Sequence, residues 1–67
     1  MSTLAYQQAV ERIRHDFLEM PGMRLTSAQV ERLSGFDGAI CRRALDDLVR
    51  ANFLYLRPDR RYARVED

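Results

Sequence analysis

The sequence predicts a small α+β domain in which three helices are followed by a C-terminal β-hairpin. Apolar residues recur every three or four positions in three successive segments, as amphipathic helices require. They then alternate with polar residues on both sides of a Pro-Asp turn, which is typical of a half-buried hairpin. We expect one domain over residues 1–67, with helices at about 3–20, 27–34 and 38–51 and the hairpin at about 54–65.

The first expected helix carries an apolar stripe at intervals of four, three and four residues, formed by Tyr6, Val10, Ile13 and Phe17. Pro21-Gly22 ends this helix, because proline disfavours helical geometry in the residue before it and glycine allows the chain to reverse. Leu4 and Leu18 fall outside the stripe but on a common side of the helix. They can contact a second subunit in a homodimer, or they can simply be exposed, as scattered surface leucines often are.

The next two helices have clear boundary signals. Thr26 and Gln29 form a capping box at the start of the helix over residues 27–34, and Gly35 suits the left-handed conformation that ends it. Asp37 is a good N-cap for the helix that follows. Two helices separated by so few residues must cross at a steep angle, so the segment is predicted to form a helix-turn-helix.

The helix over residues 38–51 has an inward face and an outward face. At about 100° per residue, the inward side is formed by Cys41, Ala44, Leu45 and Leu48. The exposed first half of such a helix usually enters the major groove of DNA, and here that half presents Gly38, Ala39, Arg42 and Arg43. Small residues at its start allow the helix to approach DNA closely, and an arginine can donate two hydrogen bonds to guanine or to phosphate.

A second interpretation of Arg42 and Arg43 is that they belong to a solvated helix face. They stand four residues before Asp46 and Asp47, a spacing at which opposite charges pair on a helix surface. Such pairs would partly neutralise both arginines. The sequence leaves both interpretations open.

The hairpin is the most basic part of the chain, with Arg57, Arg60, Arg61 and Arg64 opposed only by Asp59. A four-residue loop over residues 58–61 would pair Leu56 with Ala63 and Leu54 with Val65 on the buried face. Asn52 is expected to end the preceding helix in the left-handed conformation, and residues 23–25 can add a short third strand. The arginines suit contact with a nucleic-acid backbone, although charge also protects exposed sheet edges from aggregation.

Two runs of residues carry a family resemblance. The run Cys41 to Leu54, followed by Arg57-Pro58-Asp59-Arg60-Arg61-Tyr62, resembles the recognition helix and wing of bacterial winged helix-turn-helix regulators. Residues 17–26 resemble small stand-alone bacterial proteins of this shape that have no assigned activity. The resemblance implies a winged-helix fold and binding to double-stranded DNA. Its contact residues correspond by position to Gly38, Ala39, Arg42 and Arg43 on the helix and to Arg57, Arg60 and Arg61 at the wing tip.

The chain departs from this family pattern at Asn52 and Arg60, where such sequences often have glycine. Asparagine is a frequent substitute for glycine in a left-handed conformation. Arginine is not, so Arg60 predicts a longer or strained wing turn.

Composition limits the remaining possibilities. Eleven arginines, no lysine and ten acidic residues give 67 residues a net charge of only +1, so any basic surface is local and the composition argues against strong DNA binding. The chain has no secretory signal and no apolar run of membrane-spanning length, so we expect a cytoplasmic protein that does not contact membranes. It also leaves no room for a separate effector domain.

No pattern in the sequence favours an enzyme, a metal site or a bound cofactor. Cys41 is the only cysteine and lies on the inward stripe, where a free thiol acts as a small apolar group. His15 is the only histidine and has no cysteine nearby. Asp46 and Asp47 point about 100° apart, so an acid-base pair is not expected.

Two function classes remain. The first is a small DNA-binding protein of the transcriptional-regulator type, with the helix over residues 38–51 in the major groove and the wing on the backbone. The second is a winged-helix module that binds another protein and not DNA, which the near-zero net charge and the pair Asp46-Asp47 favour. The distinguishing observation is whether Arg42, Arg43 and the wing arginines share one positive face.

Overall fold

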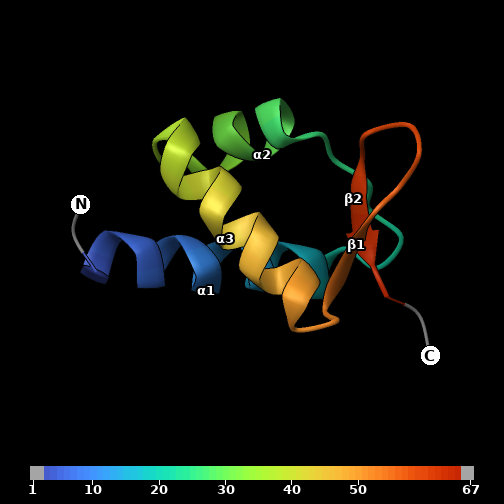
Figure 1. Ribbon diagram of the computed structural model, residues 1–67, viewed down its shortest axis with the longest axis horizontal. Helices are drawn as coiled ribbons and strands as arrows, with labels where there is room; N and C mark the ends of the chain where they lie inside the picture. The colour runs from blue at the N-terminus through green and yellow to red at the C-terminus, as the bar shows by residue number, and fades with distance from the viewer. Residues whose placement is uncertain (1–2, 66–67) are drawn as a thin grey trace.

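The computed structural model of the chain describes residues 3–65. Three helices come first, and two short strands follow in the order α1 (Thr3–Glu19), α2 (Ser27–Ser34), α3 (Gly38–Arg50), β1 (Leu54–Leu56) and β2 (Tyr62–Arg64). In Figure 1, α3 crosses α1, α2 lies beyond α3, and the hairpin stands at the end of the molecule opposite the N-terminus. The predicted fold class, α+β with a C-terminal hairpin after three helices, is confirmed.

The core forms where the apolar stripes of α1 and α3 meet. Ala9, Ile13 and Phe17 of α1 are buried, as the helical spacing of the sequence predicts. They belong to one apolar cluster with residues from all the other elements, namely Val30, Cys41, Ala44, Leu45, Leu48, Leu54 and Tyr62. Burial of these two stripes fixes which side of α3 is left exposed.

The boundaries of α2 and the start of α3 are set by local hydrogen bonds. The Gln29 amide donates to Thr26 Oγ1 at 3.2 Å, and the Thr26 amide donates to Gln29 Oε1 at 2.9 Å, which completes the capping box. Gly35 ends α2 with a φ of 76°. Asp37 Oδ2 accepts a 3.0 Å bond from the Ala39 amide at the start of α3. All three signals predicted from the sequence are confirmed.

The C-terminal end of α3 is closed by Asn52, whose φ is 61°. The Asn52 amide donates to the Val49 carbonyl and the Phe53 amide donates to the Leu48 carbonyl, each at 3.0 Å. This pair of bonds is the Schellman motif, which satisfies carbonyl groups that the helix end leaves free. Asparagine therefore occupies the position where glycine is usual, as predicted.

The predicted strand register of the hairpin is wrong by one residue. Leu54 pairs with Arg64, Tyr55 with Ala63 and Leu56 with Tyr62. The cause is the loop, which has three residues and not four. The Arg60 amide donates to the Arg57 carbonyl at 2.9 Å, the Arg57 amide donates to the Arg61 carbonyl at 2.8 Å, and Arg60 has a φ of 71°. A tight turn followed by one left-handed residue is the usual geometry of a three-residue hairpin loop.

The changed register alters which side chains of the hairpin are buried, although Ala63 is buried as predicted. Tyr62, expected to face solvent, is buried with 8% of its surface exposed, whereas Leu56 and Val65, expected to be buried, are 50% and 37% exposed. Tyr62 also exchanges two backbone hydrogen bonds with Leu25, of 3.1 and 2.7 Å. The expected third strand at residues 23–25 is therefore a single β-bridge.

Candidate nucleic-acid interface

The exposed side of α3 is the side opposite the apolar core. Ala39, Arg42 and Arg43 are exposed there, and Gly38 at the first helical position is partly exposed. Arg42 and Arg43 are adjacent, so their side chains leave the helix about 100° apart. Arg43 contacts the ring of Tyr6 on α1, whereas the charge of Arg42 acts on Tyr62 of the hairpin.

Arg43 lies on the flank that faces α1. Its guanidinium carbon is 5.5 Å from the centroid of the Tyr6 ring, which is within range of a cation–π interaction. The Tyr6 hydroxyl donates a hydrogen bond to Asp47 Oδ2, and Asp47 Oδ1 lies 3.7 Å from Arg50 Nη1. Tyr6 thus connects the first helix with the face of α3 that carries the predicted contact residues.

The charge of Arg42 acts on the phenol of Tyr62, a buried residue of β2. Burial raises the pKa of Tyr62, the charge of Asp46 raises it further, and the charges of Arg42 and Arg60 oppose the rise. Arg42 of α3 and Arg60 of the wing therefore act on the same side chain.

The anticipated neutralisation of Arg42 and Arg43 by Asp46 and Asp47 is not seen. Neither arginine has a carboxylate oxygen within 4.0 Å in the described part of the chain. Asp47 binds Tyr6 and approaches Arg50 instead. Asp46 is exposed without an ion-pair partner among residues 3–65, so one negative charge remains on the same face.

The wing tip separates its three predicted contact residues into two groups. Arg57 is partly buried, with its Nη1 donating to the Tyr55 hydroxyl at 3.3 Å and its Nε 3.4 Å from Asp59 Oδ1. Arg60 and Arg61 are exposed, and within the described ranges their side chains form no ion pair. Arg57 is therefore held inside the turn, whereas Arg60 and Arg61 extend into solvent.

Asp59 organises this turn through its carboxylate, which accepts a 3.1 Å bond from the Arg61 amide. Burial opposes the charge of Asp59, but the Arg61 amide and the neighbouring Arg57 outweigh that effect and lower the pKa of Asp59 below 3.8. A carboxylate that is ionised at neutral pH thus fixes the wing tip from which Arg60 and Arg61 project.

Gly38 lies beside a flexible side chain of α2, which a larger residue at this position would displace. A Cβ built on it would collide with the carboxylate of Glu31, which reaches across from α2. Glu31 therefore places a negative charge beside the first residue of α3. No local pattern predicts this contact, since it depends on how closely α2 and α3 cross.

Tyr6 belongs to the predicted apolar stripe of α1, but the sequence does not predict its contacts with Asp47 and Arg43 on the exposed side of α3. Its position at the edge of that stripe is the one available signal, because a tyrosine with an apolar ring and a polar tip suits the boundary between core and solvent. The partner, Asp47, is 41 residues away in the sequence. No local pattern reports a contact across that separation.

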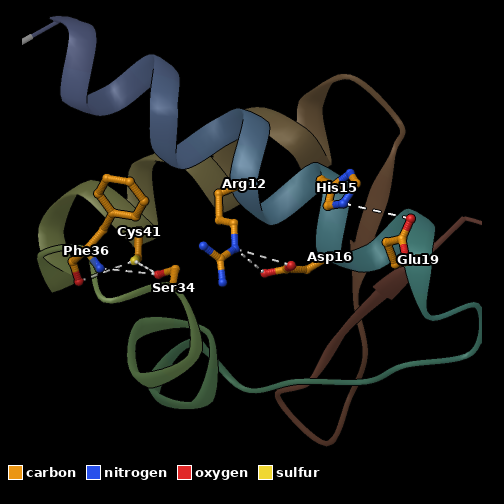
Figure 2. A network of polar contacts seen from close by, with 7 residues as sticks. All are labelled: Arg12, His15, Asp16, Glu19, Ser34, Phe36 and Cys41. Atoms are coloured by element: carbon orange, nitrogen blue, oxygen red, sulfur yellow. Dashed lines mark hydrogen bonds and ion pairs between the residues drawn. The ribbon is translucent and has the colours of Figure 1, made fainter.

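The other polar contacts stabilise the helices and their junction (Figure 2). Buried Cys41 lies 3.3 Å from Ser34 Oγ at the turn between α2 and α3, as its inward position predicted. On α1, Arg12 pairs with Asp16 at 3.3 Å and His15 approaches Glu19 at 3.8 Å. Residues 3–65 contain no cluster of three potential metal ligands. None of the helices in that range is both long and apolar enough to cross a membrane.

The site as a whole offers several exposed guanidinium groups on an α-helix and on a neighbouring hairpin. Guanidinium groups can donate paired hydrogen bonds to phosphates or to guanine, and an exposed helix has the width that the major groove admits. No protein-family model, curated protein or solved structure matches the chain significantly. The functional argument therefore depends on the arrangement of these residues.

Proposed function

We propose that the chain is a small DNA-binding protein of the transcriptional-regulator type that works in the bacterial cytoplasm. Its α3 would enter the major groove, and its wing would contact the phosphate backbone. The observation that supports this proposal is that Arg42, Arg43, Arg60 and Arg61 are all exposed, with no ion pair in the described part of the chain. Of these, Arg42 and Arg60 both carry charges that oppose the rise in the pKa of Tyr62.

The distribution of charge also supports the proposal. The net charge is +1, but residues 42–64 contain seven arginines and three aspartates, an excess of four positive charges in α3 and the hairpin. Attraction to phosphates depends on the charges that face the duplex, because salt screens those farther away than about 10 Å. A nearly neutral chain can therefore present a basic face.

The alternative is a winged-helix module that binds another protein. Asp46 is exposed on α3, and Glu31 lies beside Gly38 at the start of the same helix. Both carboxylates would repel phosphates, whereas a surface with charges of both signs suits a protein partner. A homodimer through Leu4 and Leu18 is a related possibility, since these side chains are 62% and 46% exposed on α1.

Titration of a fluorescently labelled mixed-sequence duplex with the protein, at low and at moderate salt, distinguishes the two proposals. DNA binding predicts an affinity that falls as salt rises, because each phosphate contact releases counterions. The control is Arg12→Ala, which should bind the duplex like the wild type, since Arg12 is an exposed arginine paired with Asp16 on α1, outside the proposed interface. A wild-type protein without salt-dependent affinity at low ionic strength would exclude DNA binding and leave the protein-interaction module.

A further inference from the structure

Arg43 and Asp47 stand four residues apart on α3, a spacing at which opposite charges ordinarily pair along a helix. In the structure they do not form an ion pair within 4.0 Å, and each contacts Tyr6 of α1 instead. The Tyr6 hydroxyl donates to Asp47 Oδ2, and the Arg43 guanidinium lies 5.5 Å from the centroid of the Tyr6 ring. The Tyr6 side chain thus contacts both Arg43 and Asp47, the two residues expected to pair.

The two contacts affect the charges differently. The hydrogen bond occupies one oxygen of Asp47, and Arg50 Nη1 lies 3.7 Å from the other, so this carboxylate is balanced locally. The cation–π contact uses the electrostatic attraction of the ring and leaves the N–H groups at the edge of the guanidinium free to donate. Arg43 therefore keeps its hydrogen-bonding capacity for a partner outside the chain.

We infer that Tyr6 is a positioning residue for nucleic-acid binding, which keeps Asp47 away from Arg43 so that the Arg43 guanidinium remains available to DNA. The inference rests on the proposed DNA-binding function. It assigns to α1, which carries none of the predicted contact residues, a direct influence on the binding face of α3. The contact acts through Asp47 and Arg43, and not through any contact of Tyr6 with DNA.

The adjacent residue Asp46 provides an internal comparison. It has the same carboxylate on the same helix, but in the described chain no ion-pair partner restrains it. If Tyr6 acts as inferred, the effect of removing the charge of Asp47 depends on Tyr6, whereas the effect of removing the charge of Asp46 does not. A double-mutant cycle separates these two cases.

The experiment measures the affinity of Tyr6→Phe for a labelled duplex at two salt concentrations. Phenylalanine keeps the ring under Arg43 and loses only the hydroxyl, so Asp47 is released and can pair with Arg43. We expect affinity to fall by up to about tenfold, as for one lost charge-assisted contact. The slope of log affinity against log salt should fall by about 0.9, as for one lost phosphate contact. In the Tyr6→Phe protein, Asp47→Asn should restore both the affinity and the salt slope, whereas in the wild type it should change them little. Asp46→Asn should raise the affinity equally in the two proteins.

Each outcome is informative once circular dichroism shows that the variants unfold cooperatively like the wild type. If the wild type binds the duplex and Tyr6→Phe binds it with the same affinity and salt slope, the inference is overturned and the proposed function stands. A loss in Tyr6→Phe that Asp47→Asn does not restore would show a purely structural role and would also overturn it. No binding by the wild type would remove the proposed function itself. In an Arg43→Ala background, Tyr6→Phe should have no further effect on affinity.

Discussion

Arg60 adopts a backbone conformation that arginine rarely takes, with a φ of 71° in the wing turn. The left-handed region costs a residue with a β-carbon about 1–2 kcal/mol, and glycine avoids that cost. Arg60 is also one of the exposed arginines proposed to contact phosphate. At this position the requirements of stability and of binding therefore oppose each other.

Arg60→Gly should stabilise the fold by up to about 1 kcal/mol, because relief of the strained φ exceeds the extra freedom that glycine gives the unfolded chain. The same substitution should weaken binding to all duplexes, because it removes a positive charge at the wing tip. Thermal unfolding and DNA titration measure the two effects. Arg61→Gly is the matched control, since Arg61 is not among the described residues with positive φ. That variant should lose affinity without gaining stability, and a stabilised Arg61→Gly would contradict the explanation.

Tyr62 should make the fold sensitive to alkaline pH. Burial and the charge of Asp46 raise its pKa above the ordinary 10.0, against the opposing effects of Arg42 and Arg60. At a pH between the ordinary pKa of the unfolded state and the higher pKa of the folded state, the unfolded state loses the phenol proton more readily than the folded state does. The stabilisation is therefore complete below pH 10 and is lost as pH rises through the folded pKa.

Tyr62→Phe has no proton to lose at this position, so its stability should fall less than that of the wild type between about pH 8 and about pH 11. Denaturant unfolding at each pH measures the difference. Tyr6 and Tyr55 are present in both proteins, so any contribution from them cancels in the comparison. Parallel pH profiles for the two proteins would contradict the assignment to Tyr62.

At the level of elements, α1 and α3 depend on each other through a shared core, and Leu45 at its centre is fully buried. Leu45→Ala should cost about 2–5 kcal/mol of unfolding free energy, because the cavity it leaves cannot close completely. Leu33→Ala is the control, since Leu33 on α2 is 51% exposed and its loss should cost about 0.5 kcal/mol or less. Denaturant unfolding monitored by circular dichroism compares them. Equal losses would show that the assigned core is wrong.

The element boundaries were predictable because their causes are local. Thr26, Asp37 and Asn52 each act on backbone groups within four residues, so the signal and its effect share one short segment. The hairpin register was not predictable in the same way. It depends on whether the loop has three residues or four, and that is decided by one left-handed φ at Arg60, a residue that rarely adopts it.

For the molecule as a whole, the candidate site was only partly predictable. The exposed side of α3 follows from its apolar stripe, so the exposure of Ala39, Arg42 and Arg43 was predictable from spacing. The environment of those residues was not, because it comes from other elements. Tyr6 of α1 reaches Arg43, Glu31 of α2 reaches Gly38, and both contacts depend on how the helices cross.

The arrangement of the whole molecule separates the proposed interface into a helix part and a wing part, and the two should respond differently to substitution. In the proposed complex α3 is the element that would reach base edges in the major groove, so Arg42→Ala or Arg43→Ala should cost about 1–3 kcal/mol of binding free energy, mainly on a preferred sequence. Arg60→Ala or Arg61→Ala should weaken binding to all duplexes similarly and reduce the salt slope by about one.

Selection of a preferred duplex from a random pool, followed by titration of that duplex and of a scrambled one, measures both effects. Arg12→Ala again serves as the control, because it removes an equal charge from α1. Of the two helix arginines, Arg43 lies against the ring of Tyr6, whereas the charges of Arg42 and Arg60 both act on Tyr62. Arg42→Ala should therefore also reduce the effect of a second substitution at Arg60, because the two charges act on one side of the duplex. If each of the four arginine-to-alanine variants loses the same affinity on the preferred and on the scrambled duplex, the proposed interface binds phosphates without sequence specificity.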